Sequence, residues 1–354
     1  MIVLSTQPLY TKGEHLTRRP SHNSFYATAF SSIDESVRVV FRGHERGSHA
    51  WRNLLYLCSV LTTRHDVLYA PINSLDLYLV ILLRALGLYR KPVFIWKYTE
   101  TKQPKGIKGL LVKLYYKGVD RVYMLSRTHY DEAVAAYPDM AHKFAHVPYA
   151  VDNDFYSPYA SPQRPLPAKF TIVSTGADTR DFRTLCEAAE GLDVNLHVFT
   201  TTTNGPRLYR EYLTSMSHRL PRLRAEYMED VKERGGNVLE SINTMMSGAS
   251  AVAVCCMQAD YGVGYTSVVE ALPFGRPILL TANRDIPLDV EAEGCGFVIA
   301  PYDTQGWHRA IKTLAENPHL TEEMGKKALQ LSQTRFRGKS MAEMVLKEMR
   351  EACR

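Results

Sequence analysis

The stretch from Gly264 to Thr281, GYTSVVEALPFGRPILLT, predicts a short helix that stops abruptly before a buried strand. Ser267 and Glu270 have the S-x-x-E spacing of a capping box, in which the two side chains satisfy backbone N–H groups at a helix start. Gly275 suits a helix C-terminus, and Pro277 cannot continue a helix. The apolar run after Pro277 is typical of a buried strand.

The same helix start supports a second interpretation of its polar residues. The helix follows YGVGY (261–265), which comes soon after an apolar strand. Backbone N–H groups at such a start, here over 264–268, favour a bound anion because they lack partners within the helix. Two interpretations of Glu270 therefore stay open, a capping residue and a ligand-binding carboxylate. Gly262 and Gly264 serve either an ordinary turn or a phosphate contact.

Composition limits the class of protein. A chain of 354 residues, 45% hydrophobic and 23% charged, is typical of a globular protein with two domains. The formal net charge of +6 favours anionic partners such as nucleotides or lipid headgroups. The basic residues are dispersed and no motif for reading nucleic acid is present, so we expect no nucleic-acid partner. Neither the cysteines nor the histidines have metal-ligand spacing, so we expect no metal.

The sequence also bears on location. The N-terminal MIVLSTQ has no basic region and too short an apolar stretch for a signal peptide. The longest apolar run, LYLVILLRALGL from Leu77, contains Arg84 and is too short to cross a bilayer. We therefore expect a cytoplasmic protein.

The N-terminal half alternates strand-like and helix-like segments. Apolar β-rich runs predict strands, and intervening patterns with helical period predict helices. The predicted strands are 1–6, 36–43, 65–70, 91–98, 120–126 and 144–151, and the predicted helices are 75–86, 107–116 and one from 128. Such alternation predicts a parallel sheet covered by helices.

A proline-rich stretch, YSPYASPQRPLPAK (156–169), reads as an inter-domain linker. A second alternation follows it. Its predicted strands are 170–176, 195–200, 250–256, 276–281 and 296–301, and its predicted helices are 182–190, a charged stretch over 207–234, 264–274 and two from 304. We therefore predict two doubly wound, Rossmann-like α/β domains facing a cleft, over 1–156 and 170–337, with ligands at the carboxyl ends of strands.

Several motifs resemble those of one enzyme family. In residues 268–336, a Glu-Ala pair, a Gly-x-Pro, a strand, an Asn-containing turn and a closing helix follow in the order seen in the donor site of family 4 retaining glycosyltransferases, which have the GT-B fold. VSTGADTRDFRTLCEAA (173–189) resembles the first strand, loop and helix of their nucleotide-sugar domain. Residues 120–137 and 147–158 resemble the end of their acceptor domain.

The resemblance implies an activity. It implies a retaining, hexosyltransferase-like glycosyltransferase of polysaccharide biosynthesis that needs no metal and no other cofactor. Sugar would pass from a nucleotide-diphosphate sugar to a hydroxyl of a glycan, a lipid-linked glycan or a small molecule. In relatives the C-terminal helix, which maps here onto 338–354, crosses back to the acceptor domain.

The resemblance also assigns site residues. Glu270 maps onto a carboxylate that binds the ribose hydroxyls, which suits charge-assisted hydrogen bonds. Arg180 maps onto a basic residue that neutralises the diphosphate leaving group, although a solvated arginine paired with a neighbouring aspartate stays open. These two are the catalytic candidates. The other donor-binding candidates are Gly176, Gly262, Gly264, Tyr265, Thr266 and Ser267. On the acceptor side, a strand that often ends in His ends here in WKYTE, which gives Lys97, Tyr98 and Glu100.

Two departures from the family pattern keep other functions open. The position eight residues before Glu270, where the family has a second glutamate, is Gly262. The glycine-rich loop after the first strand is replaced by TQPLYTKGEHLTRRP (6–20), with Gly13 alone. The alternatives are a non-catalytic partner subunit and a nucleotide-sugar epimerase on the same fold.

A basic helix raises the question of a membrane. In PKGIKGLLVKLYYKGVDR (104–121) lysines flank an apolar set. The set is Ile107, Leu110, Leu111 and Leu114. Two interpretations stay open: an ordinary amphipathic helix packed on its domain, and a surface that contacts the inner face of the plasma membrane.

Overall fold

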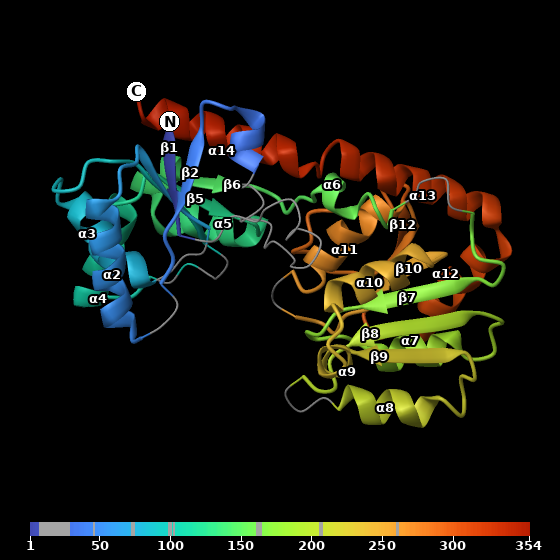
Figure 1. Cartoon of the computed structure of the whole chain (residues 1–354). Coiled ribbons are helices and arrows are strands. Elements are labelled where there is room, and N and C mark those ends of the chain that lie inside the picture. Colours follow the sequence, from blue (N-terminus) through green and yellow to red (C-terminus); the bar gives the residue numbers. More distant parts are fainter. Residues whose placement is uncertain are drawn as a thin grey trace. The chain divides into compact units, whose positions relative to one another are not determined.

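The structure is a computed structural model of the whole chain. It describes residues 1–6, 29–44, 47–71, 75–97, 101, 103–160, 165–204, 208–259 and 262–354. Contacts divide the chain into two compact units (Figure 1). Within the described residues, the first unit contains those up to Pro148 together with Gly338–Arg354, and the second contains Tyr149–Arg337.

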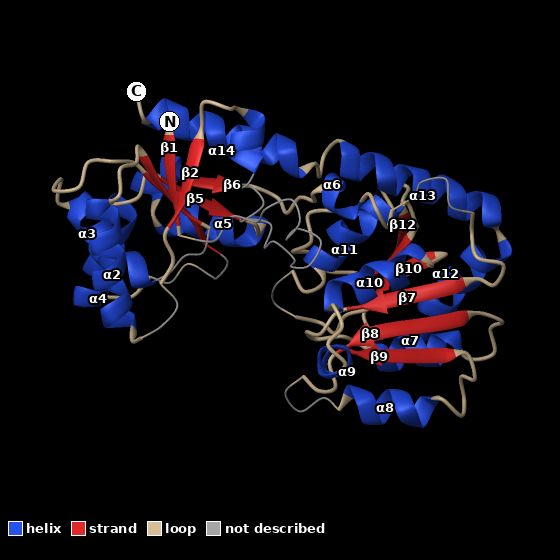
Figure 2. Cartoon of the chain, in the orientation of Figure 1, coloured by secondary structure: helices blue, strands red, loops and turns tan. Residues whose placement is uncertain are grey.

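The first unit is built on a six-stranded parallel sheet in the order β2–β1–β3–β4–β5–β6. Its strands are β1 (Ile2–Ser5), β2 (Arg38–Phe41), β3 (Val67–Ala70), β4 (Val93–Lys97), β5 (Arg121–Met124) and β6 (Phe144–His146). Its helices are α2 (His49–Thr62), η2 (Leu75–Leu77), α3 (Tyr78–Ala85), α4 (Gly106–Lys117), α5 (Arg127–Ala136), η3 (Pro138–Lys143) and α14 (Gly338–Ala352). Figure 2 shows the strands and helices of each unit.

Alternate residues of each strand in the first unit enter two different cores. In β3, Leu68 faces the core made with α2, α3, α4 and α5, whereas Tyr69 faces the core made with α14. In β4, Ile95 and Trp96 divide in the same way. Because successive strand residues point to opposite faces, a strand buried on both faces reads as a continuous apolar run.

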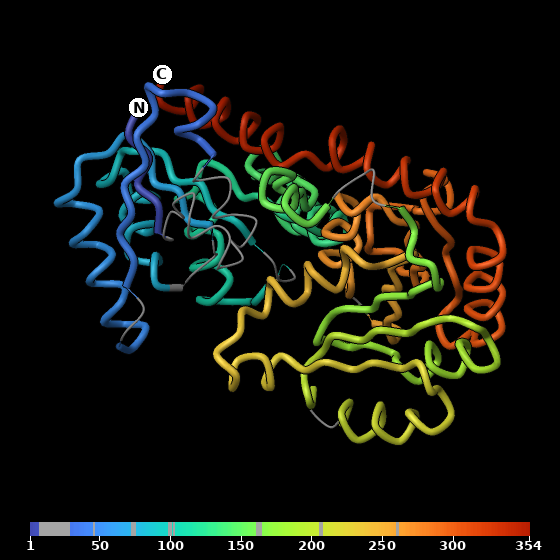
Figure 3. The backbone as a smooth tube through the Cα atoms, turned by 45° about the vertical axis from the view of Figure 1, so that its right-hand side comes forward, coloured from blue at the N-terminus to red at the C-terminus, as the bar shows by residue number. Residues whose placement is uncertain are grey.

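The C-terminal helix α14 belongs to the first unit. Val345 and Met349 lie fully buried in the core of this unit, and Glu348 accepts hydrogen bonds from Arg121 and Tyr123 of β5. The two chain ends therefore lie close together (Figure 3).

The second unit contains another six-stranded parallel sheet, in the order β12–β11–β10–β7–β8–β9. Its strands are β7 (Thr171–Thr175), β8 (Asn195–Thr200), β9 (Leu223–Tyr227), β10 (Ala251–Val254), β11 (Ile278–Thr281) and β12 (Gly296–Ile299). Its helices are α6 (Asn153–Tyr156), α7 (Phe182–Ala189), α8 (Tyr209–Met216), α9 (Met228–Glu233), α10 (Val238–Ser247), α11 (Tyr265–Ala271), η4 (Leu272–Phe274), α12 (Thr304–Glu316) and α13 (Pro318–Gln333).

The strand order of the second unit locates a binding edge. Counted within the unit, the order is that of the dinucleotide-binding fold, and the connections reverse direction between β7 and β10. Helices α7, α8 and α12 pack on one face of the sheet around the buried Trp307. The reversal opens a crevice beyond the carboxyl ends of β7 and β10, where this class of sheet binds ligands.

Two sequence predictions about boundaries differ from the structure. The unit boundary falls between Pro148 and Tyr149, so the described part of the proline-rich stretch 156–169 lies inside the second unit. The charged stretch 207–234 is not one helix, because it contains β9 between α8 and α9. Strand β9 lies at the edge of the sheet and has charged residues on one side. Its sequence therefore lacks the continuous apolar run by which a buried strand is predicted.

Helix α4 presents its apolar stripe outward. Ile107, Leu110 and Leu111 are 80%, 59% and 40% exposed, whereas Val112 and Tyr116 pack against the core of the first unit. The interpretation that this stripe packs on its own domain is therefore wrong for these three side chains. Among the described residues, no helix is both long enough and apolar enough to cross a bilayer.

Candidate functional site

A cavity of about 410 Å³ lies in the second unit at the carboxyl ends of β7 and β10. Most of its lining comes from three segments: the loop after β7, one side of α10, and residues 262–270 around the start of α11. Seven of the eight predicted donor-site residues line it. They are Gly176, Arg180, Gly262, Gly264, Thr266, Ser267 and Glu270. The exception is Tyr265, whose hydroxyl instead accepts the N–H of Tyr149.

Arg180 is a buried cation beside this cavity. It is 4% exposed, and its guanidinium donates to the carbonyl oxygens of Thr175 and Asp178 at 3.1 and 2.8 Å. It also donates to Ser267 Oγ at 2.8 Å and to Cys256 Sγ at 3.3 Å. The interpretation of Arg180 as a solvated, ion-paired surface residue is therefore wrong. A fork held at four points has little freedom, so its charge is fixed at the cavity wall.

Gly176 is required by this arginine. A Cβ at position 176 would lie 2.2 Å from Arg180 Nη2, and the backbone there has φ +130°. The space that glycine leaves is filled by the guanidinium. From the sequence we expected Gly176 to let the backbone approach a ligand closely. In the structure, Gly176 leaves the space that the Arg180 side chain occupies.

The loop that carries Arg180 is tied to the end of β10. The N–H of Met257 donates to Thr179 O at 3.0 Å, and the N–H of Asp181 donates to Cys255 O at 3.1 Å. Burial raises the pKa of the Cys256 thiol, although the Arg180 guanidinium opposes this shift. A neutral thiol therefore faces the arginine, and the carboxylates of Asp178 and Asp181 lie close enough to raise the thiol pKa further.

The capping-box interpretation of α11 is wrong. The helix begins at Tyr265, its N-cap is Gly264 with φ +86°, and no side chain caps it. Ser267 lies inside the helix and binds Arg180, while Glu270 Oε1 accepts a 2.5 Å hydrogen bond from the Tyr149 hydroxyl. Gly264 is needed because a Cβ there would lie 2.8 Å from Cys256 Sγ.

The predicted anion site over 264–268 is narrower than expected. The N–H of Tyr265 donates to Gly262 O, and the N–H of Val268 donates to Gly264 O. The N–H groups of Tyr265 and Val268 are therefore taken by backbone acceptors. The other three residues of the segment, Gly264, Thr266 and Ser267, line the cavity.

Helix α10 forms a wall that the sequence reading missed. Leu239, Ile242, Asn243 and Met246 recur at helical spacing and line the cavity, together with Met228 at the start of α9. The spacing of 239, 242 and 246 would have predicted an amphipathic helix. It would not have shown that the apolar side of this helix faces a cavity.

The acceptor-side predictions are described only in part. Lys97 ends β4 and is 7% exposed, so it lies at the carboxyl edge of the first sheet but is almost buried. Tyr98 and Glu100 lie outside the described residues.

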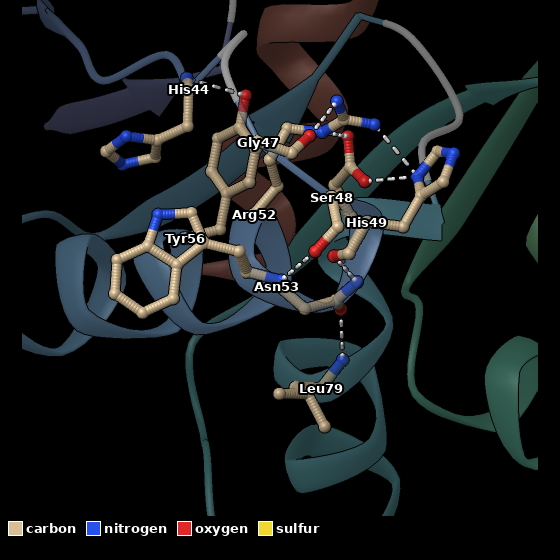
Figure 4. Close-up of polar contacts among 10 residues, drawn as sticks. His44, Gly47, Ser48, His49, Arg52, Asn53, Tyr56 and Leu79 are labelled. Carbon is tan, nitrogen blue, oxygen red and sulfur yellow. Dashed lines mark hydrogen bonds and ion pairs between the residues drawn. The ribbon is translucent and has the colours of Figure 1, made fainter.

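A polar cluster that the sequence reading missed lies at the same edge of the first unit (Figure 4). His49, the first residue of α2, has Nδ1 2.7 Å from Asp76 Oδ1. Arg52 Nε donates to Asp76 Oδ2 at 2.9 Å. Arg52 Nη2 also lies 2.9 Å from His49 Nδ1, so the three side chains form one cluster. The His49 side chain is 69% exposed, so it is accessible from solvent.

Comparisons with known proteins show the fold. No family model matches the sequence, and no curated protein matches it. A solved glycosyltransferase from Rickettsia africae has a TM-score of 0.70 at 12% identity, over 99% of this chain and 98% of that one. Anabaena HepE in complex with UDP has a TM-score of 0.64 at 13% identity, over 99% of both chains. WaaG, a glycosyltransferase involved in lipopolysaccharide biosynthesis, has a TM-score of 0.60 at 13% identity, over 99% of both chains. The chain has the two-sheet α/β architecture of the GT-B fold.

Proposed function

We propose that this chain is a glycosyltransferase whose second unit binds a nucleotide-diphosphate sugar. The observation that carries the proposal is the buried Arg180, a fixed positive charge on the wall of a 410 Å³ cavity. A cavity of this volume is within the range of small-molecule sites. The carboxylate of Glu270 supplies acceptors for the ribose hydroxyls on the same wall.

In the proposed reaction the bond between the anomeric carbon and the diphosphate oxygen breaks. A bond between the anomeric carbon and an acceptor oxygen forms on the same face, so the configuration is retained. The acceptor hydroxyl proton passes to the leaving diphosphate. Arg180 stabilises the negative charge that develops on the diphosphate, which removes the need for a metal ion.

Two solved neighbours support the choice of donor. Anabaena HepE was crystallised with UDP and with UDP-glucose, and a trehalose-6-phosphate protein from E. coli was crystallised with UDP-2-fluoro glucose. Uridine nucleotides are therefore the first probes. We infer polysaccharide biosynthesis as the setting from the description of WaaG.

We infer that the acceptor binds at the carboxyl edge of the first sheet. Lys97 and the cluster of His49, Arg52 and Asp76 lie at this edge. The exposed apolar stripe of α4, flanked by the exposed Lys105, Lys108, Lys113 and Lys117, supports peripheral contact with an anionic membrane at the cytoplasmic face. A lipid-linked acceptor fits this arrangement.

One observation favours a second candidate function. Position 262 carries no acid, and a Cβ there would lie 3.0 Å from Asp285 O. The sugar-contacting carboxylate of the family pattern is therefore absent at this position, as expected for a non-catalytic partner subunit that retains nucleotide binding.

A thermal-shift screen against nucleoside diphosphates and their sugars, followed by a transfer assay, tests the proposal. A ligand held far above its Kd raises the melting temperature. We expect stabilisation by one nucleotide family, and transfer to an added acceptor with retained anomeric configuration by NMR. Nucleotide binding without transfer would favour the non-catalytic subunit. Conversion of the donor sugar without any acceptor would favour an epimerase. The absence of any nucleotide effect would contradict the proposal.

A further inference from the structure

Asn243 is the one amide on the α10 wall of the cavity. Its neighbours along that wall, Leu239, Ile242 and Met246, are apolar, and Met228 also lines the cavity. Asn243 is 3% exposed, and its Nδ2 has no hydrogen-bond partner among the described residues. A buried amide nitrogen beside apolar side chains therefore has no partner among the described residues.

An unpaired buried amide destabilises a fold. Buried polar groups are almost always hydrogen-bonded, because water no longer solvates them. A leucine of similar size at position 243 would continue the apolar stripe of α10 without this cost. The amide is thus poorly explained by packing, and it is explained well by a polar group that arrives with the ligand.

The lining of the cavity has two chemically different parts. One part contains the Arg180 guanidinium and the Ser267 hydroxyl, together with Asp178. The other part, on α10, is apolar except for Asn243. A nucleoside diphosphate has the same division, because its diphosphate is anionic and its base is a flat ring with apolar faces and a polar edge.

We propose that Asn243 reads the polar edge of the donor's nucleobase, which lies between the apolar side chains of α10 and Met228. A terminal amide presents a donor and an acceptor side by side, as the edge of a base does. Asn243 is therefore a specificity-determining residue, a role that rests on the proposed nucleotide-sugar function.

The test compares ligands with and without a base. Binding of UDP, GDP, ADP and CDP is measured by calorimetry to find the preferred nucleotide. Inorganic pyrophosphate, which has no base, tests binding to the Arg180 part of the lining alone. We expect Asn243→Ala to weaken the preferred nucleotide about tenfold, the equivalent of about 1.4 kcal/mol. Pyrophosphate affinity should be unchanged. The matched control is Thr244→Ala, an exposed neighbour on α10, which should change neither affinity.

A second variant separates this role from a structural one. Asn243→Leu should lose nucleotide affinity but raise the melting temperature of the ligand-free protein, because it removes an unpaired buried amide. A fall in melting temperature would mean that the amide has a structural partner and would overturn the inference. Equal weakening of nucleotide and pyrophosphate, or no weakening of either, would overturn it too. If the wild-type chain binds no nucleotide, the proposed function itself fails, which is a different result from an unchanged affinity in the variants.

Discussion

Arg180 Nη2 donates a 2.8 Å hydrogen bond to Ser267 Oγ, and this bond joins the loop after β7 to helix α11 at the wall of the cavity. The two residues are 87 positions apart in the sequence. This contact therefore holds Arg180, which we propose to bind the diphosphate, against the helix that carries Glu270.

Arg180→Lys tests the fixed charge. Lysine keeps the positive charge but cannot form the fork that reaches Ser267 and two carbonyl oxygens at once. We expect nucleoside diphosphate affinity to fall at least about tenfold, and stability to fall by roughly 1–3 kcal/mol because buried acceptors lose donors. Calorimetry and thermal unfolding measure the two effects. Arg183→Lys on the exposed side of α7 is the matched control and should leave nucleotide affinity unchanged. Wild-type affinity in Arg180→Lys would remove the arginine from the diphosphate site.

Glu270→Gln tests the ribose role. The amide retains the shape and one acceptor for the Tyr149 hydroxyl but loses the charge. Charge-assisted hydrogen bonds are worth about 1.5–3 kcal/mol, so we expect nucleotide affinity to fall roughly tenfold or more while the fold stays intact. An unchanged dissociation constant would exclude the ribose contact. Tyr149→Phe is the companion variant, because it removes the hydroxyl partner of Glu270 without altering the carboxylate itself.

Chelation tests the metal-independent mechanism. In the proposed mechanism Arg180 supplies the positive charge that a divalent cation supplies in other transferases, so we expect transfer to continue at an unchanged rate in EDTA. The measurement is the initial transfer rate before and after chelation. A rate that collapses in EDTA and returns with manganese would show that an ion, and not Arg180, neutralises the diphosphate.

Changing Lys105, Lys108 and Lys113 together to Glu tests the membrane surface on α4. These side chains are exposed, so the melting temperature should hardly change. Each lysine contributes about 1 kcal/mol of attraction to an anionic surface. In a co-sedimentation assay with anionic liposomes at low salt, we therefore expect the variant to remain in the supernatant. The control changes three exposed lysines elsewhere, Lys232, Lys326 and Lys339, to Glu and should stay bound. A wild-type chain that remains in the supernatant at low salt would contradict membrane contact.

The sequence predicted the fold from patterns that depend on local physics. Buried parallel strands such as Val93–Lys97 and Ile278–Thr281 read as continuous apolar runs because both faces of their sheets are covered. Gly275 was predicted to end a helix, and it has the left-handed conformation that such an end requires. The edge strand β9 was missed because charged residues break its apolar run.

The site was harder to predict because its contacts join distant parts of the chain. Ser267 and Glu270 match a capping box, yet each has a partner far away, Arg180 and Tyr149. The pattern S-x-x-E holds no information about such partners. The sequence could not predict that Asn243 Nδ2 lacks a partner among the described residues, because burial and hydrogen-bond partners are properties of the folded unit.

Hydrogen exchange in the presence of the preferred nucleoside diphosphate tests most directly the claim that the second unit holds the donor. At saturating nucleotide, we expect slower amide exchange in three segments that are separate in sequence but share the cavity: the loop around Gly176–Arg180, helix α10 and residues 262–270. Protection confined to other segments, or no protection in any of these three at saturation, would contradict a nucleotide-sugar site in this cavity.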